Sequence, residues 1–346
     1  MAIYKEFDIQ PPESAESGDV ITNQKDIVSS GMFANGAASL TSFFTSSVQS
    51  GSSGDYYLDV YAANPNVDAN AKSQFSIAYG HFNGSGSKGR AGVVGNRSSA
   101  TIYRQLAQTL LGPGETQFTF AGSGDNVKPE YVYAISIARQ QLREKMDPGN
   151  WELHIGGLKL IDDSGATTNP AINQGGRVFN IVSGSIASGT VQTKFTATQQ
   201  PGGASLGLFY PDVGILVLNG PVLNTSASLS TTTTSNVDGG NNHKFFNAIT
   251  GSGGNYFASR REEVVTSQHY FCRVPNKEFN FSSNPSFTSG SQGDFTQATF
   301  FKNPKTFITQ VGLYNDAGEL LAVAKLSKPL LKSYSREAII KVKLDF

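Results

Sequence analysis

The C-terminal part of the chain holds the pattern that most restricts the fold. Every second residue of the segment 337–346 is small or apolar: Ala338, Ile340, Val342, Leu344 and Phe346. Side chains that alternate in this way line the two opposite faces of a β-strand. Since the positions between them are mostly charged, we predict a strand whose apolar face, Phe346 included, lies in the core.

A β-hairpin is predicted directly before this strand. The segments 307–314 and 319–326 are rich in strand-forming residues, and Asn315-Asp316-Ala317-Gly318 lies between them. Asparagine at the start and glycine at the end of four residues are typical of a tight turn. The two segments are therefore expected to pair in antiparallel fashion.

Other short apolar runs, dominated by aromatic and β-branched residues, predict further strands. They cover 56–61, 75–79, 131–137, 151–155, 178–182 and 213–218. Helical spacing is found at 100–111, before Gly112-Pro113-Gly114, and at 241–249, where Phe245 and Ile249 share one side. The expected fold class is mainly β, with antiparallel, sandwich-like sheets, one or two short helices, and long loops rich in Gly, Ser and Thr.

The length of 346 residues is large for one compact domain. We expect an N-terminal arm (1–31), a β-rich domain (32–163) and a second β-rich region (164–346) with a loop insertion at 220–243. The two β-rich regions are either separate or share one composite core.

Three segments of low apolar content or strong bias are predicted to be loops or arms. The glycine-rich loop at 80–92 lacks the spacing of a phosphate-binding loop, so it is expected to be mobile. The Ser and Thr tract at 228–235 is expected to be an exposed loop. The apolar patch Ile3–Ile9 suits an arm or an edge strand.

Charge and cysteine content exclude several classes of protein. Charged residues are 16% of the chain, and 27 basic residues balance 27 acidic ones. No overall field would attract nucleic acid or an acidic membrane, so we expect neither as a partner. The single cysteine, Cys272, excludes an internal disulfide and is expected to be a small buried hydrophobe. No apolar run approaches the ~20 residues of a membrane helix, and residues 1–10 do not resemble a signal peptide.

The sequence contains few groups arranged for chemistry. The four histidines, His81, His154, His243 and His269, lack the spacing of a zinc site and are expected at the surface or in loops. The pairs Asp162-Asp163 and Glu262-Glu263 would point to opposite faces of a strand, so solvated loop charges are expected there. Asp162-Asp163-Ser164-Gly165 and Asn315-Asp316-Ala317-Gly318 lack the ligand spacing of a calcium loop. We therefore predict no catalytic, cofactor-binding or metal-binding residues, and no cofactor.

Several segments resemble proteins of bacteriophage particles. The hairpin from Val311 to Ala324 resembles the hairpin of tail, baseplate and tail-fibre attachment proteins of tailed phages. A wider similarity, to virion structural proteins of T4-like contractile-tailed phages of the cyanophage type, is carried by segments 80–86, 210–214, 279–287 and 341–346. The resemblance implies residence in the particle, with no functional residue specified.

The expected function is that of a structural subunit of a tailed-phage virion, in its tail or baseplate, assembled in the host cytoplasm. Its partners would be neighbouring virion proteins and copies of itself, bound through strand edges and loops. The alternatives are a neck, collar or capsid-decoration protein. A module that binds host glycan and a depolymerase are further alternatives, and the depolymerase would need two carboxylates facing one cleft.

Overall fold

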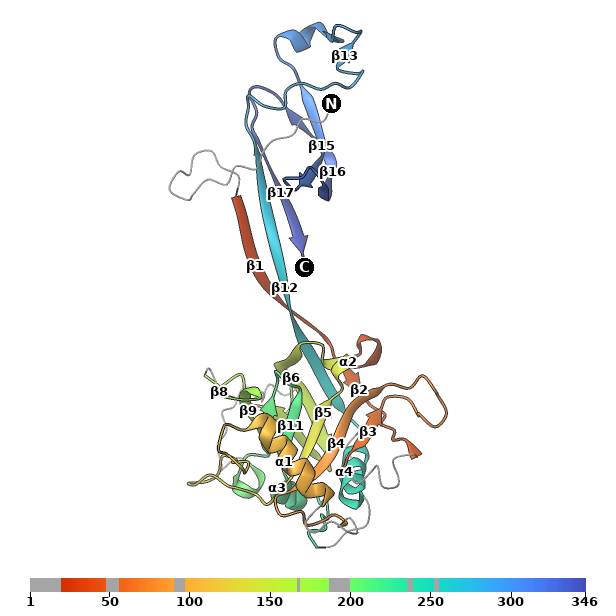
Figure 1. Ribbon diagram of the computed structural model, residues 1–346, viewed down its shortest axis with the longest axis vertical. Helices are drawn as coiled ribbons and strands as arrows, with labels where there is room; N and C mark the ends of the chain where they lie inside the picture. Colours follow the sequence, from red (N-terminus) through yellow and green to blue (C-terminus); the bar gives the residue numbers. More distant parts are fainter. Residues whose placement is uncertain are drawn as a thin grey trace. The chain divides into compact units, whose positions relative to one another are not determined.

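The computed structural model describes residues 20–47, 56–89, 97–166, 169–186, 200–234, 239–251 and 255–346 (Figure 1). The chain divides into two compact units. We call residues 28–263 the central unit, and residues 1–27 together with 264–346 the terminal unit. Strands dominate both units, and every pair with a defined register is antiparallel, which confirms the mainly β fold class.

The central unit is built on one large sheet. Its strand order is β12-β6-β7-β9-β10-β11-β5-β4-β3, with β2 paired to β12 and β8 paired to β9. The bounds are β2 (Ser39–Leu40), β3 (Leu58–Tyr61), β4 (Ser73–His81), β5 (Tyr131–Ile137), β6 (Lys145–Ile155), β7 (Leu158–Asp162), β8 (Ala171–Asn173), β9 (Gly176–Ser183), β10 (Gly207–Tyr210), β11 (Ile215–Asn219) and β12 (Phe257–Val274). The strands predicted at 56–61, 75–79, 131–137, 178–182 and 213–218 are confirmed.

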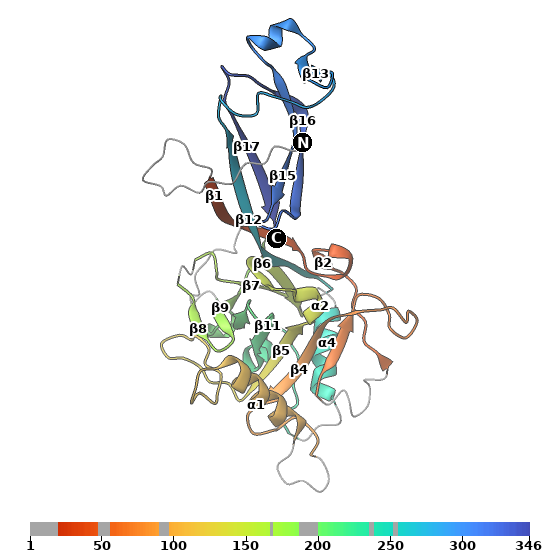
Figure 2. The ribbon, with the colours of Figure 1, turned by 45° about the horizontal axis from the view of Figure 1, so that its top comes forward.

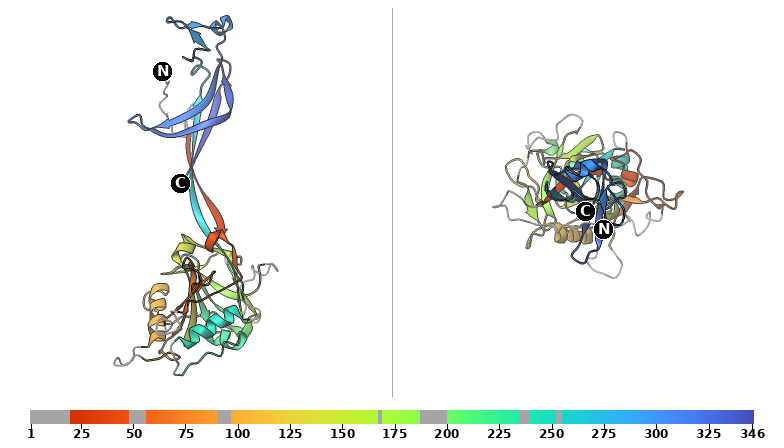
Figure 3. Two further views of the ribbon diagram at one scale, coloured as in Figure 1. Left: turned by 90° about the vertical axis from the view of Figure 1, so that its right-hand side faces the viewer. Right: turned by 90° about the horizontal axis from the view of Figure 1, so that it is seen from above.

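Helices cover both faces of this sheet (Figure 3). On β5, Tyr133 points to one face and stacks on Phe245 of a helix, with ring centroids 4.6 Å apart. The next residue back, Val132, points to the opposite face and shares a cluster with Tyr103 of another helix. The helices are α1 (Ser98–Leu110), α2 (Arg139–Leu142), α3 (Gly220–Ser226) and α4 (Gly240–Thr250), and short 3-10 turns lie at Ala34–Gly36, Pro201–Gly203 and Ala298–Phe301.

The two predicted helices are confirmed, and two others were missed. The helix expected at 100–111 is α1, and the helix expected at 241–249 is α4, with Phe245 and Ile249 buried as predicted. The loop insertion expected at 220–243 was wrong, because α3 occupies its beginning and α4 its end. Pro221 lies in the first turn of α3, where a backbone amide has no partner within the helix, so the missing N–H of proline costs nothing there. Leu223 is buried, and its packing stabilises this short helix.

The boundary expected at 163/164 lies inside the central unit. Strands β7 and β9 pair across it, for example Leu160 with Ser183. One hydrophobic cluster includes residues from Met32 to Phe257, so the composite core that the sequence left open describes the central unit. The local pattern did not show this, because β7 and β9 come from opposite sides of the expected boundary.

The segment Asp147-Pro148-Gly149-Asn150 is part of β6, although Pro-Gly between polar residues is typical of a turn. Met146 pairs with Arg261 and Trp151 with Ser259, so four residues on β6 face one on β12. Such an insertion is a large bulge, and Gly149 takes the positive φ of 81° that it requires. The strand expected at 151–155 therefore begins earlier, at Lys145.

The Ser and Thr tract is more ordered than expected over its described residues, 228–234. Leu229 is buried, and the backbone amides of Thr231 and Thr232 donate to the side chains of Asn224 and Asn241. These asparagines lie on α3 and α4. The tract is a loop as expected, and Ser228, Ser230, Thr233 and Thr234 are exposed, but acceptors on distant helices hold it in place.

The glycine-rich loop is also packed over residues 80–89. Ser99 lies at the start of α1, and its hydroxyl is 2.7 Å from that of Ser87. The Ser99 hydroxyl also donates to the carbonyl of Ser85. The amide of Gly86 donates to the carbonyl of Thr234. These contacts contradict a mobile loop, and residues 90–92 of the predicted segment lie outside the described residues.

The terminal unit contains β1 (Val20–Gly31) and β17 (Ala338–Asp345), both paired with β12, and a separate hairpin (Figure 2). The hairpin strands are β15 (Thr306–Tyr314) and β16 (Leu320–Lys332), which confirms the predicted hairpin and its turn. A small pair, β13 (Thr288–Ser289) and β14 (Asp294–Phe295), lies between β12 and β15 in sequence. Residues 20–31 of the expected arm are therefore a strand, whereas residues 1–19, with the patch Ile3–Ile9, lie outside the described residues.

The terminal strand is confirmed as β17, but its last residue is not in the core. Ala338, Ile340 and Val342 are buried, whereas Phe346 is 72% exposed. Side chains of the hairpin pack against Ala338 and Ile340, so they cover the beginning of β17 and leave its end open. The alternating pattern correctly predicted a strand, but fewer of its apolar residues lie in the core than expected.

We predict that Ile340→Ala lowers the free energy of unfolding of the terminal unit by about 2–5 kcal/mol, because it leaves a cavity in a small core. The control is the neighbouring Ile339→Ala, whose side chain is 66% exposed. Its effect should remain within about 0.5 kcal/mol. Denaturant unfolding measures both, and equal losses would contradict the assignment of the two faces.

Candidate interaction surface

The solvent-facing side of the hairpin carries large apolar side chains near its turn. Tyr314 pairs with Leu320, and Gly312 pairs with Val323, so these residues share one face. Leu320 and Val323 are each 52% exposed, and Leu321 is 66% exposed. We call Tyr314, Leu320, Leu321 and Val323 the hairpin patch.

The absence of a side chain at Gly312 shapes the hairpin patch. A Cβ atom at this position would lie 2.9 Å from the ring of Tyr314 and 3.2 Å from a methyl group of Leu320. Both side chains therefore lean over the bare backbone of Gly312 and gather into one apolar surface. Exposed apolar groups in such a cluster are typical of a protein contact.

The hairpin also offers two strand edges. In the part of the chain that the structure describes, β15 and β16 pair only with each other. A hairpin of two strands is marginally stable alone, and unpaired amide and carbonyl groups along an edge can pair with another strand. The opposite face of the hairpin is held by Ile308, Val311, Leu326 and Leu330, which pack on the core of the terminal unit. The hairpin thus has one face anchored on the core, and the other face carries the exposed side chains of the hairpin patch.

A buried lysine fixes the base of the hairpin. The ammonium group of Lys332, at the end of β16, is fully buried. It donates to the carbonyls of Asn276 and Ser333 and to the side-chain oxygen of Asn280, at 3.0, 3.1 and 3.0 Å. Three oxygens around one ammonium satisfy all its protons, so Lys332 connects β16 to the segment that follows β12.

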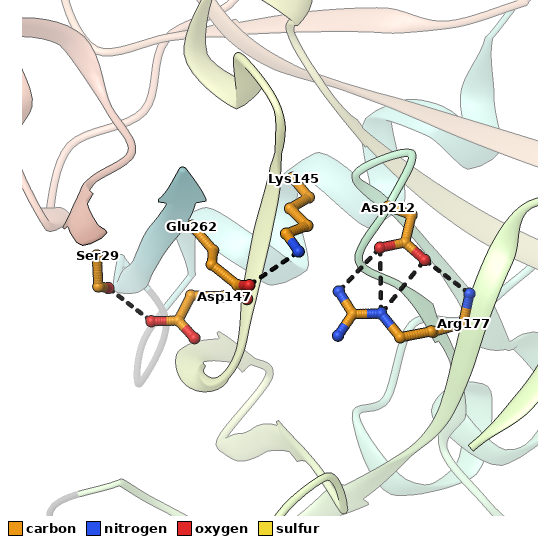
Figure 4. Close-up of polar contacts among 6 residues, drawn as sticks. All are labelled: Ser29, Lys145, Asp147, Arg177, Asp212 and Glu262. Atoms are coloured by element: carbon orange, nitrogen blue, oxygen red, sulfur yellow. Dashed lines mark hydrogen bonds and ion pairs between the residues drawn. The ribbon is translucent and has the colours of Figure 1, made fainter. Parts of the chain in front are cut away.

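Several charged side chains of the central unit form polar contacts with other protein groups (Figure 4). Lys145 and Glu262 form an ion pair of 2.8 Å, and the hydroxyl of Ser29 donates to Asp147 at 2.6 Å. The guanidinium of Arg177 donates to both oxygens of Asp212, the shortest contact being 2.8 Å. These groups hold neighbouring strands and loops together.

The acid pairs differ from the expected solvated charges. Asp162 and Asp163 are buried: Asp162 accepts from the amides of Gly149 and Ser164, and Asp163 accepts from Asn180. Burial raises the pKa of Asp162, although the hydrogen bonds from Ser164 and Gly149 act in the opposite direction. The two carboxylates have different partners, as expected for neighbours that point apart.

The second acid pair is likewise bound by protein groups. Glu262 is buried beside Lys145, and Glu263 accepts from Arg143 at 3.1 Å and from Arg261 at 2.8 Å. The expectation that both acid pairs are solvated charges in loops was therefore wrong. No local pattern indicates these ion pairs of Glu262 and Glu263, because Lys145 and Arg143 lie far away along the chain and only Arg261 is a neighbour.

The histidines also differ in part from the expectation. His81 and His269 are buried on strands, so the surface interpretation was wrong for them. Burial lowers the pKa of His81, with the carboxylate of Glu130 acting against it. His154 lies 2.6 Å from Glu152, whose other oxygen accepts from Ser185. In this chain of contacts the acid lies between serine and histidine, whereas a catalytic triad needs histidine in the middle.

The remaining candidates lie in structural positions. Cys272 is only partly buried on β12, not fully buried as expected. Asn315-Asp316-Ala317-Gly318 forms the hairpin turn, where Asn315 accepts from the amide of Glu319. No group of three His, Cys, Asp or Glu residues that could hold a metal ion occurs among the residues that the structure describes. None of the helices in those ranges is long and apolar enough to cross a membrane.

No protein-family model matches the chain, and neither a curated protein nor a solved structure matches it significantly.

The hairpin patch was missed by the sequence interpretation although its hairpin was predicted. The only local sign is the doublet Leu320-Leu321, which interrupts the alternation of β16 and coincides with a shift in register. An apolar doublet at a strand end signals a bulge as readily as a binding surface. The exposure of the patch depends on where the core of the terminal unit ends, which no local pattern shows.

We predict that Lys332→Met destabilises the terminal unit, because each buried oxygen left without a donor costs about 1–3 kcal/mol. Lys328→Met is the control, since Lys328 is an exposed residue of the same strand. It should change the free energy of unfolding by less than about 0.5 kcal/mol. Equal behaviour of the two variants in denaturant unfolding would show that Lys332 is not an anchor.

We also predict a pH dependence at Asp212. Burial alone would raise the pKa of Asp212, but the hydrogen bonds and the charge of Arg177 outweigh it and hold this pKa below 3.8. A lowered pKa adds stability that is present above pH 3.8 and is lost as the pH falls through the lowered value. In Arg177→Met, an NMR titration of the Asp212 carboxyl should give a higher pKa. An unchanged value would contradict the assigned cause.

Proposed function

We propose that the chain is a non-enzymatic structural subunit of a tailed-phage particle, in its tail or baseplate, that assembles through protein contacts. The single observation that supports this best is the hairpin patch: four large side chains lie exposed on a hairpin whose two strands pair only with each other within the described residues. Such a surface is unfavourable in a free protein and is stabilised by a partner. The resemblance to phage virion proteins supports neighbouring virion proteins as the partner.

Charge distribution supports the same proposal. Only 16% of the residues are charged, and several of these are buried, among them Glu152, Asp162, Asp163, Arg261, Glu262 and Lys332. The solvent-facing surface is therefore left with still fewer charges than the composition indicates. A surface with little charge provides weak repulsion between neighbours and suits a subunit that is surrounded by others.

Within the particle, a neck, collar or capsid-decoration protein is the second proposal. The resemblance and the surface chemistry support this role equally well, and the two proposals differ only in the location of the subunit within the particle. A glycan-binding module is a candidate of another class. The aromatic cluster around Phe287 belongs to this comparison, since three other rings lie 4.9–5.6 Å from the ring of Phe287 and one of them, Phe281, is half-exposed.

The location in the particle tests the proposal directly. Purified particles from an infection in which the gene is expressed should contain the chain at a fixed copy number by quantitative mass spectrometry. Antibody labelling should place it at the tail or baseplate. Labelling at the neck or head would support the second proposal instead. Absence from the particles, or new reducing ends in host polysaccharide incubated with the protein, would contradict a structural role.

We predict that Leu321→Lys with Val323→Lys reduces incorporation into particles by at least about tenfold. Each apolar side chain of this size contributes about 1.5–3 kcal/mol when fully buried, and about 1.4 kcal/mol corresponds to a factor of ten. The control is Thr309→Lys with Gln310→Lys, which adds the same charge to exposed polar positions of the same hairpin. Both variants should keep the melting temperature of the free protein. Normal incorporation of the patch variant would show that assembly uses another surface.

A further inference from the structure

The hairpin patch lies between an acidic end and a basic end of the hairpin. Asp316 and Glu319 are exposed at the turn, directly before β16. On the other side of the patch, Lys325 and Lys328 are exposed on β16. These four residues carry all the charges of the segment 306–331. The charge along the hairpin therefore changes sign across the apolar patch.

The basic end shares the outward face of the patch. Val323 and Lys325 are two residues apart on β16 and both are exposed, so they point to the same side of the hairpin. The residue between them, Ala324, pairs with Val311, which packs on the core of the terminal unit. A surface that covers Val323 would therefore also meet the ammonium group of Lys325.

The acidic end is held by the turn. The side-chain amide of Asn315 donates to the carboxylate of Glu319 at 2.7 Å, and the side-chain oxygen of Asn315 accepts from the backbone amide of Glu319 at 2.8 Å. An ionised carboxylate accepts several hydrogen bonds, so Glu319 can also accept from a lysine of a partner. The turn thus places a negative charge beside the apolar patch.

We propose that the hairpin patch packs face to face on the hairpin patch of a second copy of this chain, with the two β16 strands antiparallel. The inference rests on the proposed function, because it takes the hairpin patch as the contact used in assembly and names its partner. Sheets that pack face to face commonly keep their strands nearly aligned. A two-fold axis relates the copies, so every contact between them occurs twice.

The order of the charges determines the orientation. Ala322 lies three residues from both Glu319 and Lys325, and six residues from both Asp316 and Lys328. A two-fold axis close to Ala322 therefore brings the acidic end of each hairpin to the basic end of the other, about 10 Å along the strand from the axis for the inner pair. With the strands parallel, like charges would meet. A second copy supplies the required order of charges by symmetry, whereas another partner would need it independently.

The apolar side chains match under the same symmetry. Leu321 and Val323 lie on either side of Ala322, so Leu321 of each copy meets Val323 of the other. Leu321 is 66% exposed and Val323 is 52% exposed, and both are branched aliphatic side chains that would leave water together. Few residues take part compared with the roughly 20–30 a side of a standard interface, so we expect a weak dimer of the free protein.

Sedimentation equilibrium of the intact protein tests the pairing. Between roughly 10 µM and 1 mM, a range that populates a weak dimer, the full chain should change from monomer to dimer. Leu321→Lys with Val323→Lys should remain monomeric over the same range. A full chain that stays monomeric, or a dimer that is unchanged in this variant, would overturn the proposal.

An exchange of charges distinguishes a second copy from any other partner. Glu319→Lys alone and Lys325→Glu alone should each weaken the dimer by at least about tenfold, because each makes two attractive contacts repulsive. With both substitutions in one chain, acid meets base again and the dimer should recover. The control is Lys305→Glu, an exposed residue before β15 at the base of the hairpin, which should leave the dimer unchanged. If the chain with both exchanged charges is no stronger than the single variants, the antiparallel pairing is wrong.

Incorporation into particles separates the failure of this inference from the failure of the proposed function. If the free chain is monomeric while Leu321→Lys with Val323→Lys is lost from particles, the patch binds a different neighbour, so the second copy is wrong and the proposed function stands. If the free chain dimerises and responds to the exchanged charges as expected but is absent from particles, the pairing is supported and the proposed function is wrong.

Discussion

The hydrogen-bond ladder of β12 is the interaction on which the rest of the structure depends. This strand of 18 residues pairs with β6 over Phe257–Glu262 and with β17 over Ser267–Val274, so both units include it in their sheets. A strand of such length needs a partner along most of its backbone, because unpaired amides and carbonyls away from water are costly. The large bulge at 147–150 allows β6 to follow β12 despite four additional residues. The sequence of β12 contains both charged and β-branched residues. Three of its charged residues, Arg261, Glu262 and Glu263, form ion pairs within the central unit.

The two units treat polarity in opposite ways. In the central unit, carboxylates such as Asp162 and Asp163 are buried and bound by amides, which fixes strand and loop positions at the expense of charge at the surface. In the terminal unit, the apolar side chains of the hairpin patch remain exposed while an ammonium group, Lys332, is buried. A buried charged group is stable only when hydrogen bonds compensate for its desolvation. Asp162, Asp163 and Lys332 each have such hydrogen bonds. The consequence is a central unit whose strands and loops are cross-linked by buried polar groups and a terminal unit that exposes apolar side chains.

Local signals predicted the elements of the fold well and their organisation poorly. Strands β5, β15, β16 and β17 and helices α1 and α4 were predicted because each has a complete period of apolar residues between turn or stop signals. The sequence left open whether the regions before and after 163/164 share one core, because the pairing of β7 with β9 crosses that point and pairing between distant strands leaves no local trace. For the same reason the solvated acid pairs and the mobile glycine-rich loop were wrong, since their partners, such as Asn180 and Asn241, come from other elements. The hairpin of the candidate surface was predictable, whereas its exposure was not.

The composition of the hairpin patch separates a protein partner from a glycan. A sugar-binding surface stacks aromatic rings on the faces of pyranose rings and surrounds them with acids and amides that bind hydroxyl groups. The hairpin patch has one aromatic residue, Tyr314, and its other side chains are branched aliphatic ones. Aliphatic side chains pack well against one another but form no hydrogen bonds with the hydroxyl groups of a sugar. The other aromatic group of the terminal unit is closed on itself, since the rings of Phe281, Phe295 and Phe300 all pack against Phe287. Phe287 is buried within this group, so the rings stabilise the segment between β12 and β15 instead of presenting a flat row. Within the described residues the two hairpin strands pair only with each other, so the apolar surface and these edges suit a strand or a sheet of the protein partner that we propose.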